Sequence, residues 1–242
     1  MNSFPAIEID KVKAWDFRLI DENTAESLNV AYGVDSNYLD GVGVSITSIV
    51  INNRHVNLDF YIIADVYNDD FFQKVEKLAE QYQLRITLYR INTDNLQCLP
   101  CTQVWSRAMY FRLFAFQLLG VTLNRLLYLD ADVVCKGNIS QLLHLEFNGA
   151  VAAVVRDVDP MQEKAVVRLS DPELRGQYFN SGVVYLDLKK WTEAKLTEKA
   201  LSILMSKDSI YKYPDQDVMN VLLKGMTIFL PREFNTISVS YT

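Results

Sequence analysis

The sequence predicts a single α/β domain around a mostly parallel half-sheet, and three observations lead to this prediction. From residue 28 onward, short apolar runs alternate with amphipathic helical stretches, as expected of strands joined by helical crossovers. Half of the 242 residues are hydrophobic, which is enough for a sizeable core. No repeat, low-complexity run or linker divides the sequence. We therefore predict one domain over residues 28–242, after an extension over residues 1–27 with one short helix.

The first half of this domain has the order strand, helix, strand, helix, strand. The apolar runs Leu28–Tyr32, Leu58–Ala64 and Leu84–Ile91 are typical of buried strands. Between them, Val42–Ile51 and Phe71–Tyr82 carry apolar residues at helical spacing. Strands joined by helices in this order pair in parallel through right-handed crossovers, so we expect a doubly wound half-sheet.

The second half begins with a long aromatic-rich helix, expected over Thr102–Leu119, and then the apolar run Leu126–Val134. The pattern after this run is less regular than the pattern before it. Further strands are expected at residues 150–155, 183–186 and 226–230, and further helices at residues 161–169, 188–191, 196–205 and 216–223.

Asp130 and Asp132 lie where the run Leu126–Val134 turns polar. Side chains two residues apart on an extended chain point to the same face, so these carboxylates would lie side by side. A hard divalent cation relieves the repulsion between neighbouring carboxylates, and open α/β sheets bind ligands outside the carboxyl ends of their strands. We therefore predict a Mg²⁺ or Mn²⁺ site that holds nucleotide phosphates. The alternative is a strand end that breaks into a solvated turn.

Three other polar clusters are candidate ligand sites. Asp35 and Asn37 follow the first strand, where they would meet a base or ribose, although Asp-x-Asn is also common turn chemistry. Asn180 lies in a polar trio expected directly before a strand and would bind sugar hydroxyls, unless the trio is only a tight turn at Gly182. Asp215–Asp217 opens a helix, where a single acid would be enough for capping.

Composition excludes several classes of function. The net charge of −6 argues against nucleic acid as the main partner. Three cysteines imply no disulfide framework and fit a reducing cytosol, and Cys98-x-x-Cys101 has no second pair to complete a zinc site. Neither a secretory leader nor an 18-residue apolar run is found in the sequence. P-loop and dinucleotide-binding glycine patterns do not occur either.

Six segments, taken in order, resemble glycosyltransferase family 8. They are Val34–Tyr38, Tyr110–Leu113, Leu127–Asp132, Phe179–Val183, Leu188–Trp191 and Asp215–Asn220. The resemblance runs from about Leu28 to Asn235, and six segments in order are far more specific than any one of them. The opening segment Phe4–Asp10 adds a similarity to the family's enterobacterial lipopolysaccharide core glucosyltransferases.

This resemblance implies a GT-A type fold, in which one α/β domain surrounds a nucleotide-binding half-sheet. It also implies transfer of glucose or galactose from UDP-glucose or UDP-galactose to the lipopolysaccharide core, with retention at the anomeric carbon. Such an enzyme would be cytoplasmic and work at the cytoplasmic face of the bacterial inner membrane.

The resemblance also implies roles for individual residues. Asp130 and Asp132 would hold Mn²⁺ or Mg²⁺ against the UDP diphosphate. Asp35 and Asn37 would contact the uridine end of the donor. The residues expected to hold the donor sugar are Arg112, Asn180 and Asp215.

Gln216 would lie beside the anomeric carbon, opposite the leaving UDP, so Gln216 and Asp215 are the candidate catalytic residues. Retention requires either two inversions or attack on the front face of the sugar. Because a neutral amide is a poor nucleophile, we favour front-face substitution in which the UDP oxygen takes the acceptor proton. A covalent sugar on Asp215 or Gln216 would contradict this mechanism.

One family motif is missing from these 242 residues: a His-x-x-Gly-x-x-Lys-Pro-Trp stretch that carries a third metal ligand and a phosphate-binding lysine. The basic, aromatic C-terminal tail that would contact the membrane is missing too. We therefore expect a C-terminally truncated chain with weak donor binding, little transfer, and exposed apolar surface that favours homo-oligomers. The alternative is an inactive UDP-sugar-binding remnant. A haloacid-dehalogenase-like phosphatase fits less well, because its Asp-x-Asp would lie on the first strand.

Overall fold

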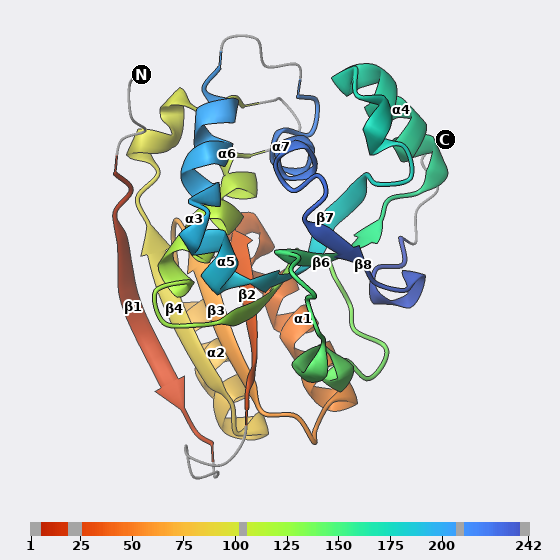
Figure 1. Ribbon diagram of the computed structural model, residues 1–242. Coiled ribbons are helices and arrows are strands. Elements are labelled where there is room, and N and C mark those ends of the chain that lie inside the picture. Colours follow the sequence, from red (N-terminus) through yellow and green to blue (C-terminus); the bar gives the residue numbers. More distant parts are fainter. Residues whose placement is uncertain (1–5, 19–25, 102–105, 207–210, 238–242) are drawn as a thin grey trace.

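The computed structural model, which describes residues 6–18, 26–101, 106–206 and 211–237, contains one eight-stranded mixed sheet in its described part (Figure 1). Its strand order is β1-β4-β3-β2-β5-β7-β6-β8. The strands are β1 (Ile9–Asp16), β2 (Leu28–Val34), β3 (Leu58–Ala64), β4 (Arg85–Ile91), β5 (Arg125–Leu129), β6 (Ala152–Arg156), β7 (Phe179–Asp187) and β8 (Thr227–Phe229).

The predicted parallel half-sheet is confirmed. Strand β2 pairs in parallel with β3 from Leu28↔Leu58 to Val34↔Ala64, and it pairs in parallel with β5 on its other side. Strand β4 continues the parallel set beyond β3. Helices α1 (Leu39–Asn52) and α2 (Asp69–Tyr82) make the crossovers and pack against one face of the sheet. The carboxyl ends of these strands therefore lie along one edge.

Helices α3 (Phe111–Leu119), α5 (Leu188–Glu193), α6 (Leu196–Leu204) and α7 (Pro214–Leu222) cover the opposite face (Figure 1). Trp191 anchors this layer because its ring meets Phe116 edge-on at 5.0 Å and its indole N–H donates to Thr197. The helix predicted from Thr102 is shorter than expected. It begins at Phe111 after a 3₁₀ turn over 107–110, and residues 102–105 lie outside the described residues.

Residues 9–16 correct the prediction of a short helix in the N-terminal extension. They form β1, which pairs antiparallel with β4 at the edge of the sheet (Figure 1). Trp15 is buried there, and its indole N–H donates to Glu76 on α2. Pairing with a strand far along the sequence decides the conformation, which local pattern could not reveal. The division into an extension and a catalytic domain stays a prediction.

Strand β7 corrects the expected position of the polar trio. The strand begins at Phe179, so Asn180 lies inside it and not before it. The register with β6 shifts from Val154↔Val184 to Val155↔Asn180, which marks a bulge at this end. Asn220 of α7 accepts from the Phe179 amide at 2.7 Å and donates to the Phe179 carbonyl at 2.9 Å. The Asn220 side chain thus provides hydrogen bonds to the Phe179 backbone at the end of β7 where the pairing with β6 is irregular.

Helix α4 (Asp159–Leu169) stands apart from the two main layers. It follows β6 and packs through a small cluster of its own, which includes Leu174 and Tyr178. Since β6 and β5 both run antiparallel to β7, the carboxyl end of β6 lies at the same edge as that of β5. Among the described residues, no helix has the length and apolarity that a membrane span requires.

Candidate active site

The polar residues predicted to form the site gather at the edge where β2, β5 and β6 end. Asp130 directly follows β5, and its backbone N–H donates to the Gly182 carbonyl on β7 at 2.9 Å. Asp35 directly follows the neighbouring strand β2. This is the edge at which open α/β sheets bind ligands.

Arg112 of α3 is the centre of this edge. Its side chain is only 5% exposed, and its guanidinium reaches Asp130 at 2.7 Å and Asp215 at 3.1 Å. It also donates to the Ser181 carbonyl at 2.7 Å and lies 4.8 Å from the ring centre of Tyr128. One buried guanidinium thus joins two acids that are far apart in sequence.

The acids outnumber the arginine in this cluster. Burial raises the pKa of Asp130 to about 6, and the negative charges of Asp215 and Asp132 add to this rise while Arg112 opposes it. The Asp130 side chain is still 39% exposed, and Asp132 is exposed. The cluster therefore carries an excess of negative charge that a cation from solvent can reach.

Asn180 and Gly182 form the wall beside Asp130. The Asn180 side-chain oxygen accepts from the Gly182 amide at 2.9 Å and from Asn235 at 2.8 Å. A Cβ atom at Gly182 would lie 3.0 Å from this oxygen and 3.1 Å from a carboxylate oxygen of Asp130. Only a bare backbone fits here without displacing one of the two side chains.

Asp35 and Asn37 form a separate group at the end of β2. The Asp35 carboxylate accepts from the Asn37 amide at 3.0 Å and from the Ser106 hydroxyl at 2.7 Å. These contacts are the turn chemistry that the Asp-x-Asn pattern indicates. Among the described residues, no hydrogen bond joins this pair to Arg112 or Asp130, so a ligand would have to span the two groups.

Gln216, on the first turn of α7, lies behind Ser181. Its side-chain oxygen accepts from the Ser181 amide at 3.1 Å, and its nitrogen donates to Asp157 and to the Tyr178 hydroxyl, both at 3.1 Å. Asp157 and Tyr178 were not predicted from the sequence. Asp157 follows the buried strand β6, so the strand-end rule that indicated Asp130 would also have indicated it.

The triplet at the start of α7 sends its side chains to three different places. Asp215 contacts Arg112, and Gln216 contacts Ser181. Asp217 accepts from the backbone amides of residues 212 and 213, which precede the first helical residue, so it holds the preceding loop against α7. Of the three, Asp215 is the one that forms an ion pair with Arg112.

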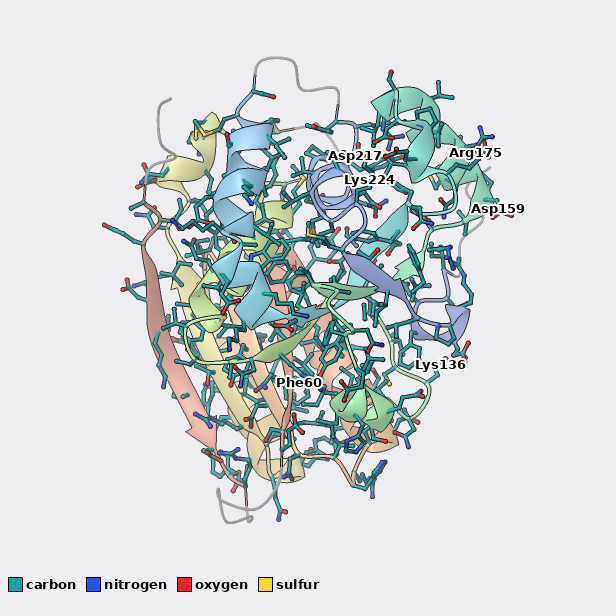
Figure 2. All side chains as sticks on the ribbon, in the orientation of Figure 1. Phe60, Lys136, Asp159, Arg175, Asp217 and Lys224 are labelled. Atoms are coloured by element: carbon teal, nitrogen blue, oxygen red, sulfur yellow. The ribbon has the colours of Figure 1, made fainter. Side chains whose placement is uncertain are left out.

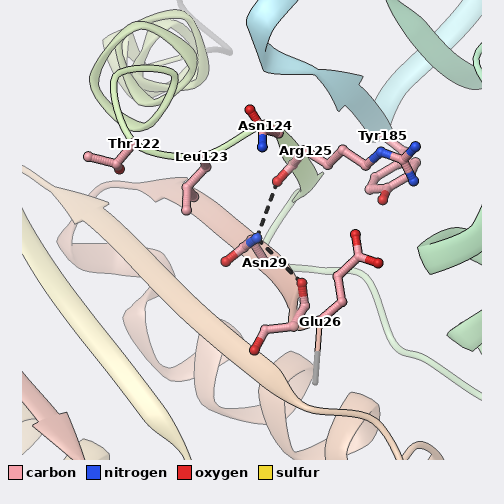
Figure 3. A pocket seen from close by; sticks show the side chains of 8 residues that line it. Glu26, Asn29, Thr122, Leu123, Asn124, Arg125 and Tyr185 are labelled. Atoms are coloured by element: carbon pink, nitrogen blue, oxygen red, sulfur yellow. Dashed lines mark hydrogen bonds between the residues drawn. The ribbon is translucent and has the colours of Figure 1, made fainter. Parts of the chain in front are cut away.

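Two cavities lie at opposite edges of the sheet. One, of about 540 Å³, is at the carboxyl end of β6 and is lined by residues 155–160 with Leu230 and Arg232. The other, of about 470 Å³, is at the amino ends of β2 and β5, where Asn29 donates to the Arg125 carbonyl (Figure 3). Only the first adjoins the Gln216 side chain, through Asp157.

The chain has a fold of the GT-A type, with a parallel half-sheet and an acid cluster at the carboxyl edge of that sheet. Its fold matches the crystal structure of the galactosyltransferase LgtC in complex with donor and acceptor sugar analogs, with a TM-score of 0.72 and 22% identity. The match covers 85% of this chain and 74% of that chain.

The family model described as Glycosyl transferase family 8 matches residues 29–242, and the chain belongs to this family. It is 88% identical over 237 residues to the lipopolysaccharide 1,2-glucosyltransferase of Escherichia coli (strain K12), covering 98% of this chain and 70% of that relative. It is 35% identical to the lipopolysaccharide 1,3-galactosyltransferase of Salmonella typhimurium, covering 91% of this chain and 67% of that one. The predicted family and fold are confirmed.

Proposed function

We propose that this chain transfers glucose or galactose from a UDP-sugar to the lipopolysaccharide core, at the cytoplasmic face of the bacterial inner membrane. The observation that carries the proposal is the Arg112–Asp130–Asp215 cluster at the carboxyl edge of the sheet. The high identity to a lipopolysaccharide 1,2-glucosyltransferase makes glucose the first donor to test.

The carboxylates of Asp130 and Asp132 suit a divalent cation. They are hard oxygen donors, and burial, with the charges of Asp215 and Asp132, raises the pKa of Asp130, so a bound cation would stabilise its ionised form. Among the described residues, no group of three or more His, Cys, Asp or Glu is placed to hold a metal. Phosphate oxygens of the donor would therefore complete the ligand set around Mn²⁺ or Mg²⁺. The ion would act as a Lewis acid that stabilises charge on the leaving diphosphate.

The other residues of the edge bind and orient the donor. Asp35 and Asn37 would meet the uridine, since they lie at the exposed end of β2. Asn180 and Asp215 would hold sugar hydroxyls beside the acid cluster. Arg112 would act with them on the donor sugar, and it keeps Asp215 in place through its 3.1 Å contact.

Gln216 would face the sugar from the side opposite the leaving group. Its amide is neutral and fully hydrogen-bonded, so it is a poor nucleophile. We therefore propose front-face substitution. The acceptor hydroxyl attacks on the same side as the departing UDP, and a UDP phosphate oxygen takes the hydroxyl proton.

The acceptor would enter through the cavity at the end of β6. This cavity includes Asp157, which contacts Gln216, and it is flanked by Arg156 and Arg232. The Arg156 guanidinium lies 3.9 Å from the ring centre of Phe229, which fixes it at the rim. A sugar acceptor would find hydrogen-bond donors and acceptors on both sides.

Calorimetric titration of UDP with and without Mn²⁺ tests the donor site, and transfer of labelled glucose from UDP-glucose to lipopolysaccharide tests the reaction. We expect binding that depends on Mn²⁺ and is lost in Asp130→Asn. Binding of UDP without transfer of sugar would favour the second candidate, an inactive UDP-sugar-binding protein. The observation behind this candidate is that, among the described residues, fewer than three metal-ligating side chains come together. Absence of UDP binding under both conditions would overturn the proposal.

A further inference from the structure

A buried chain of hydrogen bonds runs from α4 to Gln216. It links Arg168, Asp217, Tyr178 and Gln216, and Figure 2 shows Asp217 in the region between α7 and α4. We infer that Tyr178 and Asp217 are positioning residues that fix the orientation of the Gln216 amide. The consequence for catalysis rests on the proposed function, whereas the orientation itself can be tested without activity.

The chain begins at Asp217, which is fully buried. Its carboxylate accepts from the Arg168 guanidinium at 2.6 and 3.2 Å and from the backbone amides of Lys212 and Tyr213 at 3.0 and 3.1 Å. All of these contacts are made by N–H donors, so the carboxylate is the acceptor in each of them. An ionised carboxylate can only accept hydrogen bonds.

The state of Asp217 sets the direction of the next bond. The Tyr178 hydroxyl lies 2.5 Å from Asp217 and must donate to it, because the carboxylate has no proton to give. Burial, together with the charge of Asp217, raises the pKa of Tyr178, so the hydroxyl keeps its proton. That single proton is committed to Asp217. The Tyr178 oxygen is left only as an acceptor.

Gln216 must then present its nitrogen to Tyr178. The nitrogen donates one proton to the Tyr178 oxygen and the other to the Asp157 carboxylate, both at 3.1 Å. The Gln216 oxygen accepts from the Ser181 amide at 3.1 Å. A flipped amide would set oxygen against two acceptors and nitrogen against a donor, so the partners permit one orientation.

This orientation limits what Gln216 offers a substrate. Both amide protons are already used, so the polar atom left to act on a substrate is the carbonyl oxygen, which also accepts from the Ser181 amide at 3.1 Å and from the Ser181 hydroxyl at 3.4 Å. The carbonyl of Ser181 in turn accepts from Arg112 at the acid cluster. A fixed carbonyl dipole facing the donor sugar would stabilise the positive charge that develops at the anomeric carbon.

The test uses Tyr178→Phe, which removes the acceptor of one Gln216 proton. We expect kcat for transfer to fall about 10-fold to 100-fold, while the UDP affinity stays within twofold because the acid cluster is untouched. The matched control is Tyr61→Phe. The Tyr61 hydroxyl is also mostly buried and donates to one side chain, Asn29, at 3.3 Å near the opposite edge. This control should leave kcat unchanged.

A second readout needs no catalysis. The side-chain amide signals of Gln216 can be assigned in NMR spectra by their loss in Gln216→Glu. In Tyr178→Phe, one of the two protons should move to lower chemical shift and exchange faster with water, while Tyr61→Phe leaves both unchanged. Should Tyr178→Phe not fold, the wild-type chain serves instead, because both Gln216 amide protons should then exchange slowly with water, and fast exchange of both would overturn the inference.

The outcomes separate the two proposals. Unchanged Gln216 amide signals in Tyr178→Phe would overturn the inference, as would a changed amide with an unchanged kcat. If the wild-type chain shows no transfer, the proposed function fails. The amide signals then still support or overturn the positioning role by themselves.

Discussion

Two regions at the carboxyl edge are both built from arginine and aspartate, but they differ in charge. One carries more negative than positive charge, and in the other the arginine and the carboxylate balance. In the open cluster, one arginine faces several acids, and part of the cluster is exposed; its members are Arg112, Asp130, Asp132 and Asp215. In the closed network, one arginine faces one fully buried carboxylate; its members are Arg168, Tyr178, Gln216 and Asp217. The comparison teaches that a cluster with unbalanced charge is suited to bind a ligand, whereas a buried cluster with balanced charge stabilises the structure around the site.

The largest effect on folding is expected from Asp217→Ala in the closed network. Removing one partner of a buried ion pair leaves the Arg168 charge uncompensated, which costs about 3 kcal/mol of unfolding free energy. Urea denaturation measures this loss. The control is Glu163→Ala, whose carboxylate contacts Arg175 at the surface and should cost less than about 1 kcal/mol. Equal losses of unfolding free energy in both variants would contradict the claim that the closed network stabilises the fold more than a surface ion pair does.

In the open cluster, the corresponding substitution should affect binding and spare folding. Asp130→Asn removes a proposed metal ligand, so Mn²⁺-dependent UDP affinity should fall at least about 100-fold in calorimetry. The melting temperature should stay the same or rise, because the neutral amide is no longer repelled by Asp132 and Asp215. A large drop in melting temperature would mean that Asp130 stabilises the fold, as we expect of Asp217.

Arg112→Lys tests whether the shape of the guanidinium matters. A lysine keeps the charge but cannot contact Asp130, Asp215 and the Ser181 carbonyl together. We expect UDP affinity to fall about 10-fold, from the loss of one or two charged hydrogen bonds. Lys190→Arg, at a site of surface contacts, is the control and should leave affinity unchanged. Wild-type affinity in Arg112→Lys would show that charge alone suffices.

The smallest effect is expected from Gly182→Ala. The new Cβ would press on Asn180 and Asp130, so we expect UDP affinity to fall a few-fold, with little change in stability. Gly43→Ala is the matched control, because nothing lies within 4 Å of its added Cβ and the position is inside α1. It should raise the unfolding free energy by roughly 0.5–1 kcal/mol and leave UDP binding unchanged. Identical UDP affinities in the two variants would show that Gly182 does not line the donor site.

The sequence by itself determined the parallel half-sheet, because the alternation of apolar runs and amphipathic helices is a local property. The strands at Leu28 and Leu58 begin where their apolar runs begin. The acids after β2 and β5 were also predictable, since a polar break directly follows a buried strand. The family was recognisable because six short segments keep their order.

Only the tertiary structure decided how these residues are joined. Arg112 meets Asp215, and Tyr178 meets Asp217, across long separations in sequence that no local pattern encodes. Residues 9–16 became a strand because β4 offered an open edge, and β7 began early because Asn220 satisfies its backbone. The pattern of side chains specifies which groups are polar. Their partners, and hence their charge balance and orientation, exist only once distant segments pack together.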